Sequence, residues 1–151
     1  MQARMPDVYK LAAGGHRALA AMESFLNGSD APQETLELVR LRVSQINGCG
    51  LCVDMHAHQG HQKGITQERL WAVAAWREAP FFTDAERAAL ALAESVTRIA
   101  DNPDGVEEEV WREAAAHFDE PALAALVMAI ASVNAWNRIN VATRQIAGSY
   151  R

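Results

Sequence analysis

Apolar residues recur every three or four positions along nearly the whole chain, and no segment shows the alternating pattern of a strand. Because this spacing places side chains on one face of an α-helix, it predicts an all-α protein. Start and stop signals divide the pattern into about six to seven helices, expected at about 7–25, 33–47, 49–64, 66–76, 83–100, 106–117 and 119–146.

Capping and turn residues set the expected helix boundaries. Thr83 and Glu86 form a capping-box pattern, in which each residue satisfies a backbone N–H at a helix start. A turn cluster at 101–105 separates two later helices, and Pro121 suits the first turn of the last one. Gly14 and Gly15 are expected to weaken the first helix, because glycine is unfavourable in a helix interior.

The 151 residues contain no internal repeat, low-complexity tract or linker, so we expect a single compact helical domain over residues 1–151. Half of the residues are apolar and 22% are charged, a composition that excludes a disordered chain. The apolar residues are abundant for helices of this length. They therefore also predict a homo-oligomer, because the short helices cannot bury them all within one chain.

Charge and hydropathy argue against several classes of partner. The formal net charge is −5 and no basic run occurs, so binding to nucleic acid or to an anionic membrane lacks its usual electrostatic basis. No apolar signal core follows the N-terminus, and the most apolar stretch, 121–133, is too short to span a bilayer comfortably. We therefore expect a cytoplasmic protein with no nucleic-acid and no membrane partner.

The two cysteines, Cys49 and Cys52, lie three positions apart at the start of a predicted helix. In a reducing compartment such a pair is more often catalytic or metal-binding than structural. At about 100° per residue, His56 lies about 40° from Cys52 on the same helix face, whereas His58 and His61 point elsewhere. The helix N-terminus also favours a thiolate. Together these features predict a redox centre in which His56 exchanges a proton with the thiols.

Two other interpretations of the pair remain open. The cysteines can be small core residues, or Cys49, Cys52 and His56 can join another histidine around zinc. Structural zinc sites usually draw ligand pairs from two segments, and this sequence has no second pair. We therefore expect no metal and no other cofactor. Covalent haem is excluded, because Val53 rather than histidine follows the second cysteine.

The preceding helix carries a polar stripe at helical spacing, formed by Glu37, Arg40, Ser44 and Asn47. Such a stripe is either a solvated face or the wall of a polar pocket, and periodicity alone does not decide between them. The turn at 47–48 lets this helix fold back beside the helix that carries the cysteines. We therefore expect Glu37, the only acid of the stripe, to pair with His56 and raise its basicity.

Glu37, eleven further residues and then Cys49-x-x-Cys52-x-x-x-His56 resemble the motif of the alkylhydroperoxidase D-like branch of the carboxymuconolactone decarboxylase family. Segments 42–49, 75–78, 83–90 and 134–138 also resemble small single-domain members of this family. The resemblance implies an all-helical fold that assembles as a homo-oligomer, often a trimer or hexamer. It also implies thiol-dependent reduction of hydroperoxides.

The resemblance assigns a role to each residue of the motif. The family's second cysteine, here Cys52, attacks the peroxide, and the first, here Cys49, resolves the sulfenic acid to a disulfide. The family's proton relay corresponds to Glu37 and His56. Characterised alkylhydroperoxidases carry a histidine just before the second cysteine, where this chain has Leu51, a change that bears on proton delivery. Because the decarboxylase branch lacks the cysteine pair, lactone decarboxylation is not expected.

The leading hypothesis is therefore a peroxidase whose substrate is a small-molecule hydroperoxide and whose reductant is an external thiol or dithiol. The alternatives are a thiol–disulfide oxidoreductase and a non-catalytic redox sensor or assembly module that uses the same pair. Other conspicuous side chains are expected in the core, at an interface or between helices; they are Trp71, Trp76, Phe81, Phe82, Asn134, Asn137, Arg138 and Arg144.

Overall fold

The computed structural model describes residues 1–150, and within that range it has eight α-helices and no strand. The helices are α1 (Val8–Leu11), α2 (Ala13–Asn27), α3 (Gln33–Ile46), α4 (Gly50–Gln62), α5 (Gln67–Ala72), α6 (Asp84–Thr97), α7 (Glu108–His117) and α8 (Glu120–Thr143). Short 3₁₀ turns follow α5 at Val73–Ala75 and α6 at Ile99–Asp101. The all-α prediction is confirmed, and α3 to α8 correspond one to one with the predicted helices.

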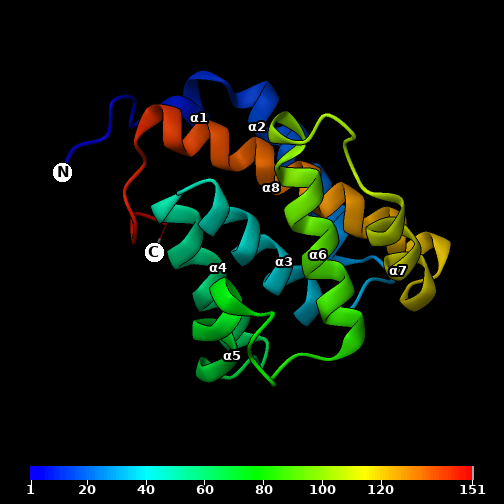
Figure 1. Cartoon of the computed structure of the whole chain (residues 1–151). Coiled ribbons are helices and arrows are strands. Elements are labelled where there is room, and N and C mark those ends of the chain that lie inside the picture. The colour runs from blue at the N-terminus through cyan, green and yellow to red at the C-terminus, as the bar shows by residue number, and fades with distance from the viewer. Residues whose placement is uncertain (151) are drawn as a thin grey trace.

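The first predicted helix is wrong in one respect, because it is two helices that meet at Ala12 (φ −104°, ψ 41°). Gly14 and Gly15 lie inside α2, so low helix propensity does not set the break. Contacts with α8 hold the N-terminal segment instead: the backbone N–H of Arg4 donates to the Thr143 carbonyl at 2.8 Å. Tertiary contacts thus override local propensity here. Figure 1 shows α1 and α2, in blue, alongside α8, in orange.

The main core lies between α3, α6 and α8, where side chains with almost no solvent exposure pack together. It includes Leu36, Val39, Val43, Ala89, Leu92, Ala93, Leu126, Ala129 and Ile130. The predicted capping box starts α6: Thr83 Oγ1 accepts the Glu86 N–H, and the Glu86 carboxylate accepts the Thr83 N–H. This satisfies two backbone donors that a helix start would otherwise leave without partners.

Two glycines bring α4 close to α3. Gly48 has a φ of 67°, in the left-handed region that glycine adopts without strain, and it turns the chain between the two helices. Gly60 lets α4 pack closely against Ile65 and against Leu70 of α5, and it lies beside Glu37 of α3. A Cβ atom there would sit 3.1 Å from Leu70 Cδ2, 3.2 Å from Ile65 Cδ1 and 3.7 Å from Glu37 Cβ. Glu37, near the start of the polar stripe of α3, therefore faces α4.

Helix α8 extends well beyond the apolar stretch at 121–133 and ends slightly short of the predicted helix at 119–146. Its 24 residues include a window of mean hydropathy 1.4, so by length and composition alone it could cross a membrane. Half of that window is buried inside the molecule, as in a core helix. Its last turns also carry Asn137 and Asn140, both buried and both hydrogen-bonded to side chains of other helices.

Candidate active site

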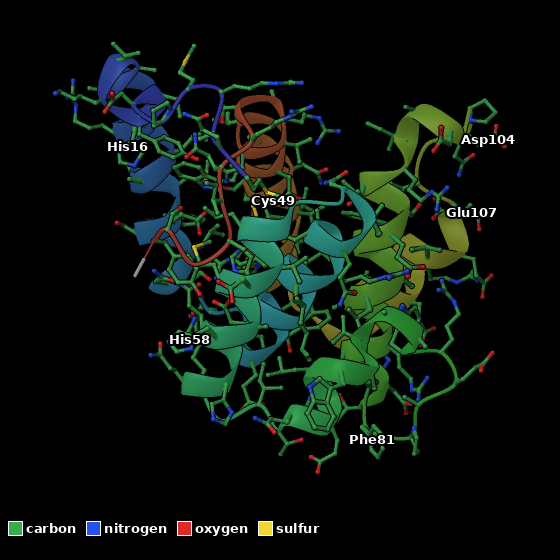
Figure 2. All side chains as sticks on the ribbon, turned by 90° about the vertical axis from the view of Figure 1, so that its left-hand side faces the viewer. His16, Cys49, His58, Phe81, Asp104 and Glu107 are labelled. Atoms are coloured by element: carbon green, nitrogen blue, oxygen red, sulfur yellow. A yellow bond between two sulfur atoms is a disulfide. The ribbon has the colours of Figure 1, made fainter. Side chains whose placement is uncertain are left out.

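Cys49 and Cys52 form a disulfide at the N-terminus of α4, with their Cα atoms 5.3 Å apart (Figure 2). Cys49 is the N-cap of the helix, and its Sγ accepts the backbone N–H of Cys52 at 3.3 Å. Cys49 is 1% exposed and Cys52 is fully buried. Because the partial positive charge of a helix N-terminus stabilises anions, the reduced pair at this position favours a thiolate.

The structure brings Glu37 and His56 together from α3 and α4. Glu37 Oε2 lies 3.1 Å from His56 Nδ1, and both side chains are buried. His56 lies one helical turn beyond Cys52 on α4, so the acid–imidazole pair and the disulfide share one side of that helix. The arrangement matches the pairing predicted from helical spacing.

Glu37 is also held by two cations. Arg40 Nη1 and Lys63 Nζ each donate to its Oε1 at 2.8 Å. Burial raises the pKa of Glu37, but the hydrogen bond and charge of His56, with Arg40 and Lys63, outweigh this effect and lower the pKa to about 2. The carboxylate is thus ionised at neutral pH. It favours the His56 tautomer with the proton on Nδ1, which leaves Nε2 to accept a proton.

This buried charge predicts a specific loss of stability in acid. The folded pKa of Glu37, about 2, is below its ordinary value of 4.5, so its stabilising contribution is present above about pH 4.5 and disappears as pH falls towards 2. The shift corresponds to about 3 kcal/mol. We expect Glu37→Gln to be less stable than the wild type at pH 7 and to lose less stability on acidification. Denaturant unfolding at pH 7, 4 and 3 measures the free energy of unfolding of the variant and of the wild type. If that free energy falls equally with pH in the two proteins, Glu37 is not a buried ionised carboxylate.

A second acid extends the network across the molecule. Arg40 Nη2 donates to Glu23 Oε2 of α2 at 2.8 Å. Glu23 Oε1 in turn accepts the Ser132 hydroxyl at 2.6 Å and the Trp136 indole N–H at 3.1 Å, both from α8. Side chains of α2, α3, α4 and α8 therefore fix the position of the Glu37 carboxylate.

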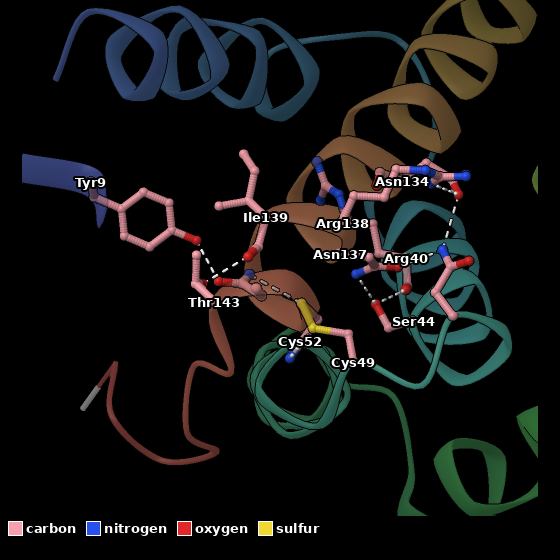
Figure 3. The surroundings of a disulfide bond; sticks show 12 residues. Tyr9, Arg40, Ser44, Cys49, Cys52, Asn134, Asn137, Arg138, Ile139 and Thr143 are labelled. Atoms are coloured by element: carbon pink, nitrogen blue, oxygen red, sulfur yellow. Dashed lines mark hydrogen bonds between the residues drawn. A yellow bond between two sulfur atoms is a disulfide. The ribbon is translucent and has the colours of Figure 1, made fainter. Parts of the chain in front are cut away.

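The polar stripe of α3 is an inner wall of the protein, not a solvated face. Ser44 is fully buried, and Asn137 Nδ2 donates to its hydroxyl at 3.1 Å. Asn47 Nδ2 donates to both Asn134 Oδ1 and Asn137 Oδ1 at 2.9 Å. Figure 3 shows Asn134 and Asn137 of α8 beside Ser44 of α3. The expectation that Asn134 and Asn137 join helices is confirmed.

A cleft of about 1000 Å³ is lined by Glu37, Arg40 and His56 and reaches Leu51 and Asn140, which are neighbours of Cys52, although neither cysteine lines it. This volume is at the upper end of the range typical of small-molecule sites. Much of the remaining wall is apolar or aromatic; it includes Tyr9, His16, Leu51, Met55, Val133, Trp136 and Ile146. Leu51, which replaces the family's histidine, therefore lines the cleft as an apolar group.

Sequence reasoning missed the aromatic part of this wall. Tyr9, His16 and Trp136 pack together, with ring centroids 5.0 Å apart for Tyr9–His16 and 5.6 Å for Tyr9–Trp136. They come from α1, α2 and α8, and nothing in a single sequence links positions so far apart. The four aromatic residues that the sequence made conspicuous do not line the cleft: Trp76 and Phe82 are buried in the core, and Trp71 and Phe81 are exposed.

The donors of the zinc alternative are not brought together. Across residues 1–150, no group of three His, Cys, Asp or Glu side chains is placed to hold a metal ion. His58 and His61 are exposed, and His58 Nε2 lies 3.1 Å from Gln62 Nε2. The spacing argument thus separated these two histidines correctly from His56.

Known proteins resemble this chain in sequence over most of its length. The model of the carboxymuconolactone decarboxylase family matches residues 11–95. The uncharacterized protein YdfG of Bacillus subtilis is 36% identical over 141 residues, which cover 93% of this chain and 95% of YdfG. The uncharacterized protein YnjA of Escherichia coli is 36% identical over 105 residues, but these cover only 56% of YnjA.

Solved structures share the fold. ATU0492 of Agrobacterium tumefaciens, whose suggested role is that of the antioxidant defence protein AhpD, superposes with a TM-score of 0.91 at 32% identity and covers 97% of this chain and 98% of that one. An uncharacterized peroxidase-related protein of Silicibacter has a TM-score of 0.82 at 21% identity, over 99% of this chain and 78% of that one. With the family model matching more than half of its residues, this chain belongs to the carboxymuconolactone decarboxylase family, in the alkylhydroperoxidase D-like branch.

Proposed function

We propose that this protein is a thiol-dependent hydroperoxide reductase whose working residues are Cys49, Cys52, His56 and Glu37. One observation carries the proposal: a disulfide at a helix N-terminus lies one turn from an imidazole that is paired with a buried carboxylate. Two thiols that can cycle to a disulfide, next to a positioned base, are the groups that a thiol peroxidase needs. The family membership is consistent with a redox role.

In the proposed reaction the Cys52 thiolate attacks the terminal oxygen of a hydroperoxide. The O–O bond breaks, the alkoxide takes a proton and leaves as an alcohol, and Cys52 becomes a sulfenic acid. The Cys49 thiolate then attacks the Cys52 sulfur, which forms the disulfide and releases hydroxide that is protonated to water. An external thiol or dithiol reduces the disulfide, so that each cycle consumes one hydroperoxide and two reducing equivalents.

The roles proposed for His56 and Glu37 follow from their contacts. His56 Nε2 accepts the proton of the Cys52 thiol and returns it to the departing alkoxide, directly or through one water. Glu37 holds the proton on Nδ1 and stabilises the imidazolium that forms in between. Leu51 contributes no titratable group, so in this chain the proton transfer rests on His56.

Burial of the sulfurs favours a small oxidant over a folded protein disulfide. Cys49 and Cys52 are 1% and 0% exposed, so a folded partner protein cannot reach them without a large opening of the structure. A small molecule can enter the cleft as far as Asn140, which contacts Cys52, so a smaller local movement brings it to the sulfur. We therefore expect cumene hydroperoxide to oxidise the reduced protein faster than a disulfide-containing model protein does, and dithiothreitol to support many turnovers. Stopped-flow oxidation and steady-state peroxide consumption measure the two quantities. Faster oxidation by the protein disulfide would favour a thiol–disulfide oxidoreductase, and a single oxidation without turnover would favour a sensor.

A further inference from the structure

The two sulfurs of the disulfide receive hydrogen bonds from different donors. Cys49 Sγ accepts a backbone N–H from its own helix, that of Cys52. Cys52 Sγ instead accepts a side-chain N–H from another helix: Asn140 Nδ2 of α8 donates to it at 3.3 Å. Both Cys52 and Asn140 are buried, at 0% and 4% exposure, so bulk water does not compete for this contact.

Tyr9 sets the orientation of the Asn140 amide. Its hydroxyl donates to Asn140 Oδ1, which leaves the amide nitrogen directed at the Cys52 sulfur (Figure 3). Burial raises the pKa of Tyr9, and the hydrogen bond with Asn140 only partly opposes this, so the hydroxyl keeps its proton at neutral pH. The Tyr9 ring is held in turn against His16 and Trp136.

The helix N-terminus alone does not decide which cysteine carries the negative charge. Cys49 is the N-cap, and its sulfur already accepts an N–H, so the field of α4 stabilises a thiolate there at least as well as on Cys52. The Asn140 hydrogen bond acts on Cys52 only. We propose that Asn140 is a further catalytic residue, which makes Cys52 the attacking sulfur by stabilising its thiolate, and that Tyr9 is the positioning residue for its amide.

The proposal that Cys52 is the attacking sulfur rests on the proposed function. Stabilisation of the Cys52 thiolate by Asn140 also affects the second half of the cycle, in which an external thiol reduces the disulfide. When an external thiolate attacks the disulfide, a bond forms to one sulfur and the other leaves with the electron pair. A donor on Cys52 makes it the better leaving group, because a stabilised thiolate departs more readily. The external thiol is therefore expected to form its mixed disulfide with Cys49, and Cys52 is released as the thiolate.

The test titrates Cys52 alone, in reduced Cys49→Ser protein, by the ultraviolet absorbance of its thiolate. A hydrogen bond to a charged group is strong enough that Asn140→Ala should raise the pKa of Cys52 by about one unit, with about tenfold less thiolate at a pH below both values. Tyr9→Phe keeps the aromatic ring but loses the hydroxyl that orients the Asn140 amide, so it should raise the pKa of Cys52 by less than Asn140→Ala does. Asn137→Ala is the matched control, a buried asparagine of α8 that contacts Ser44 and Asn47 but no sulfur, and it should leave the pKa unchanged.

Thermal unfolding checks that each variant is folded, and Tyr9→Phe carries the test if Asn140→Ala does not fold. In protein with both cysteines, Asn140→Ala should also slow disulfide reduction by dithiothreitol at a fixed pH. An unchanged Cys52 pKa in the folded variants, or an equal shift in Asn137→Ala, would overturn the proposal. The titration uses no peroxide. If Asn140→Ala raises the Cys52 pKa but the wild type does not reduce hydroperoxides, only the proposed peroxidase function is refuted. If the wild type reduces hydroperoxides but Asn140→Ala leaves the Cys52 pKa unchanged, only the role of Asn140 is refuted.

Discussion

Replacing Cys52 with serine should abolish hydroperoxide reduction and leave only the uncatalysed background rate. A serine oxygen, unlike a cysteine sulfur, is not oxidised by a hydroperoxide, and the remaining Cys49 lacks the side-chain donor that faces Cys52. Steady-state consumption of cumene hydroperoxide with dithiothreitol as reductant measures the effect. Thermal unfolding of the reduced proteins provides the control for folding, because the variant cannot form the disulfide.

Cys49→Ser should behave differently, because its attacking sulfur is intact. One equivalent of hydroperoxide should convert Cys52 to a sulfenic acid that has no resolving thiol, and excess hydroperoxide should over-oxidise it to the sulfinic acid. Trapping with a sulfenic-acid reagent followed by mass spectrometry distinguishes the two products. If one equivalent of hydroperoxide gave no trapped sulfenic acid in Cys49→Ser, or if Cys52→Ser formed the trapped species instead, the assigned order of attack would be wrong.

His56→Ala and Glu37→Gln should each slow oxidation of the reduced protein at pH 7 by about 10²–10⁴-fold, the usual range for general acid–base catalysis. His56 both takes the proton of the thiol, which at an ordinary pKa near 8.5 is only a few per cent thiolate at neutral pH, and returns it to the departing alkoxide. At pH 9 the thiol ionises unaided and both variants should lose less. Stopped-flow oxidation at the two pH values measures this, with His58→Ala, an exposed histidine of the same helix outside the cleft, as the control.

The double variant of Glu37 and His56 tests whether the two residues act as one unit. Because Glu37 contacts the imidazole through Nδ1, removing both should slow oxidation little more than removing either. Independent defects that multiply would show that the pair is no relay. Glu37→Gln also leaves Arg40 and Lys63 without their shared carboxylate, so its unfolding must be followed on the same samples to separate lost chemistry from lost structure.

The pairing of Glu37 with His56 was predictable in part from local rules. Helical periodicity puts each residue on a defined face, and the turn at Gly48 allows α3 to fold back beside α4. The same argument separated His56 from His58 and His61. Periodicity could not decide whether the polar stripe of α3 faces solvent or protein, because that depends on α8, which follows much later in the chain.

The rest of the candidate site depends on contacts between distant parts of the sequence. Tyr9 and Asn140 are 131 positions apart, and only the packing of α1 against α8 brings them together. The break at Ala12 likewise has no local signal. Assembly as a trimer or hexamer concerns other copies of the chain and stays a prediction.

The central claim is that a hydroperoxide oxidises Cys49 and Cys52 to a disulfide. It is tested most directly by counting the thiols of the reduced protein before and after one equivalent of cumene hydroperoxide. The account predicts that both cysteine thiols of each chain are lost, that one equivalent of alcohol appears, and that peptide mapping finds the Cys49–Cys52 disulfide. Thiols that survive the treatment, or that are lost without formation of the alcohol, would contradict it.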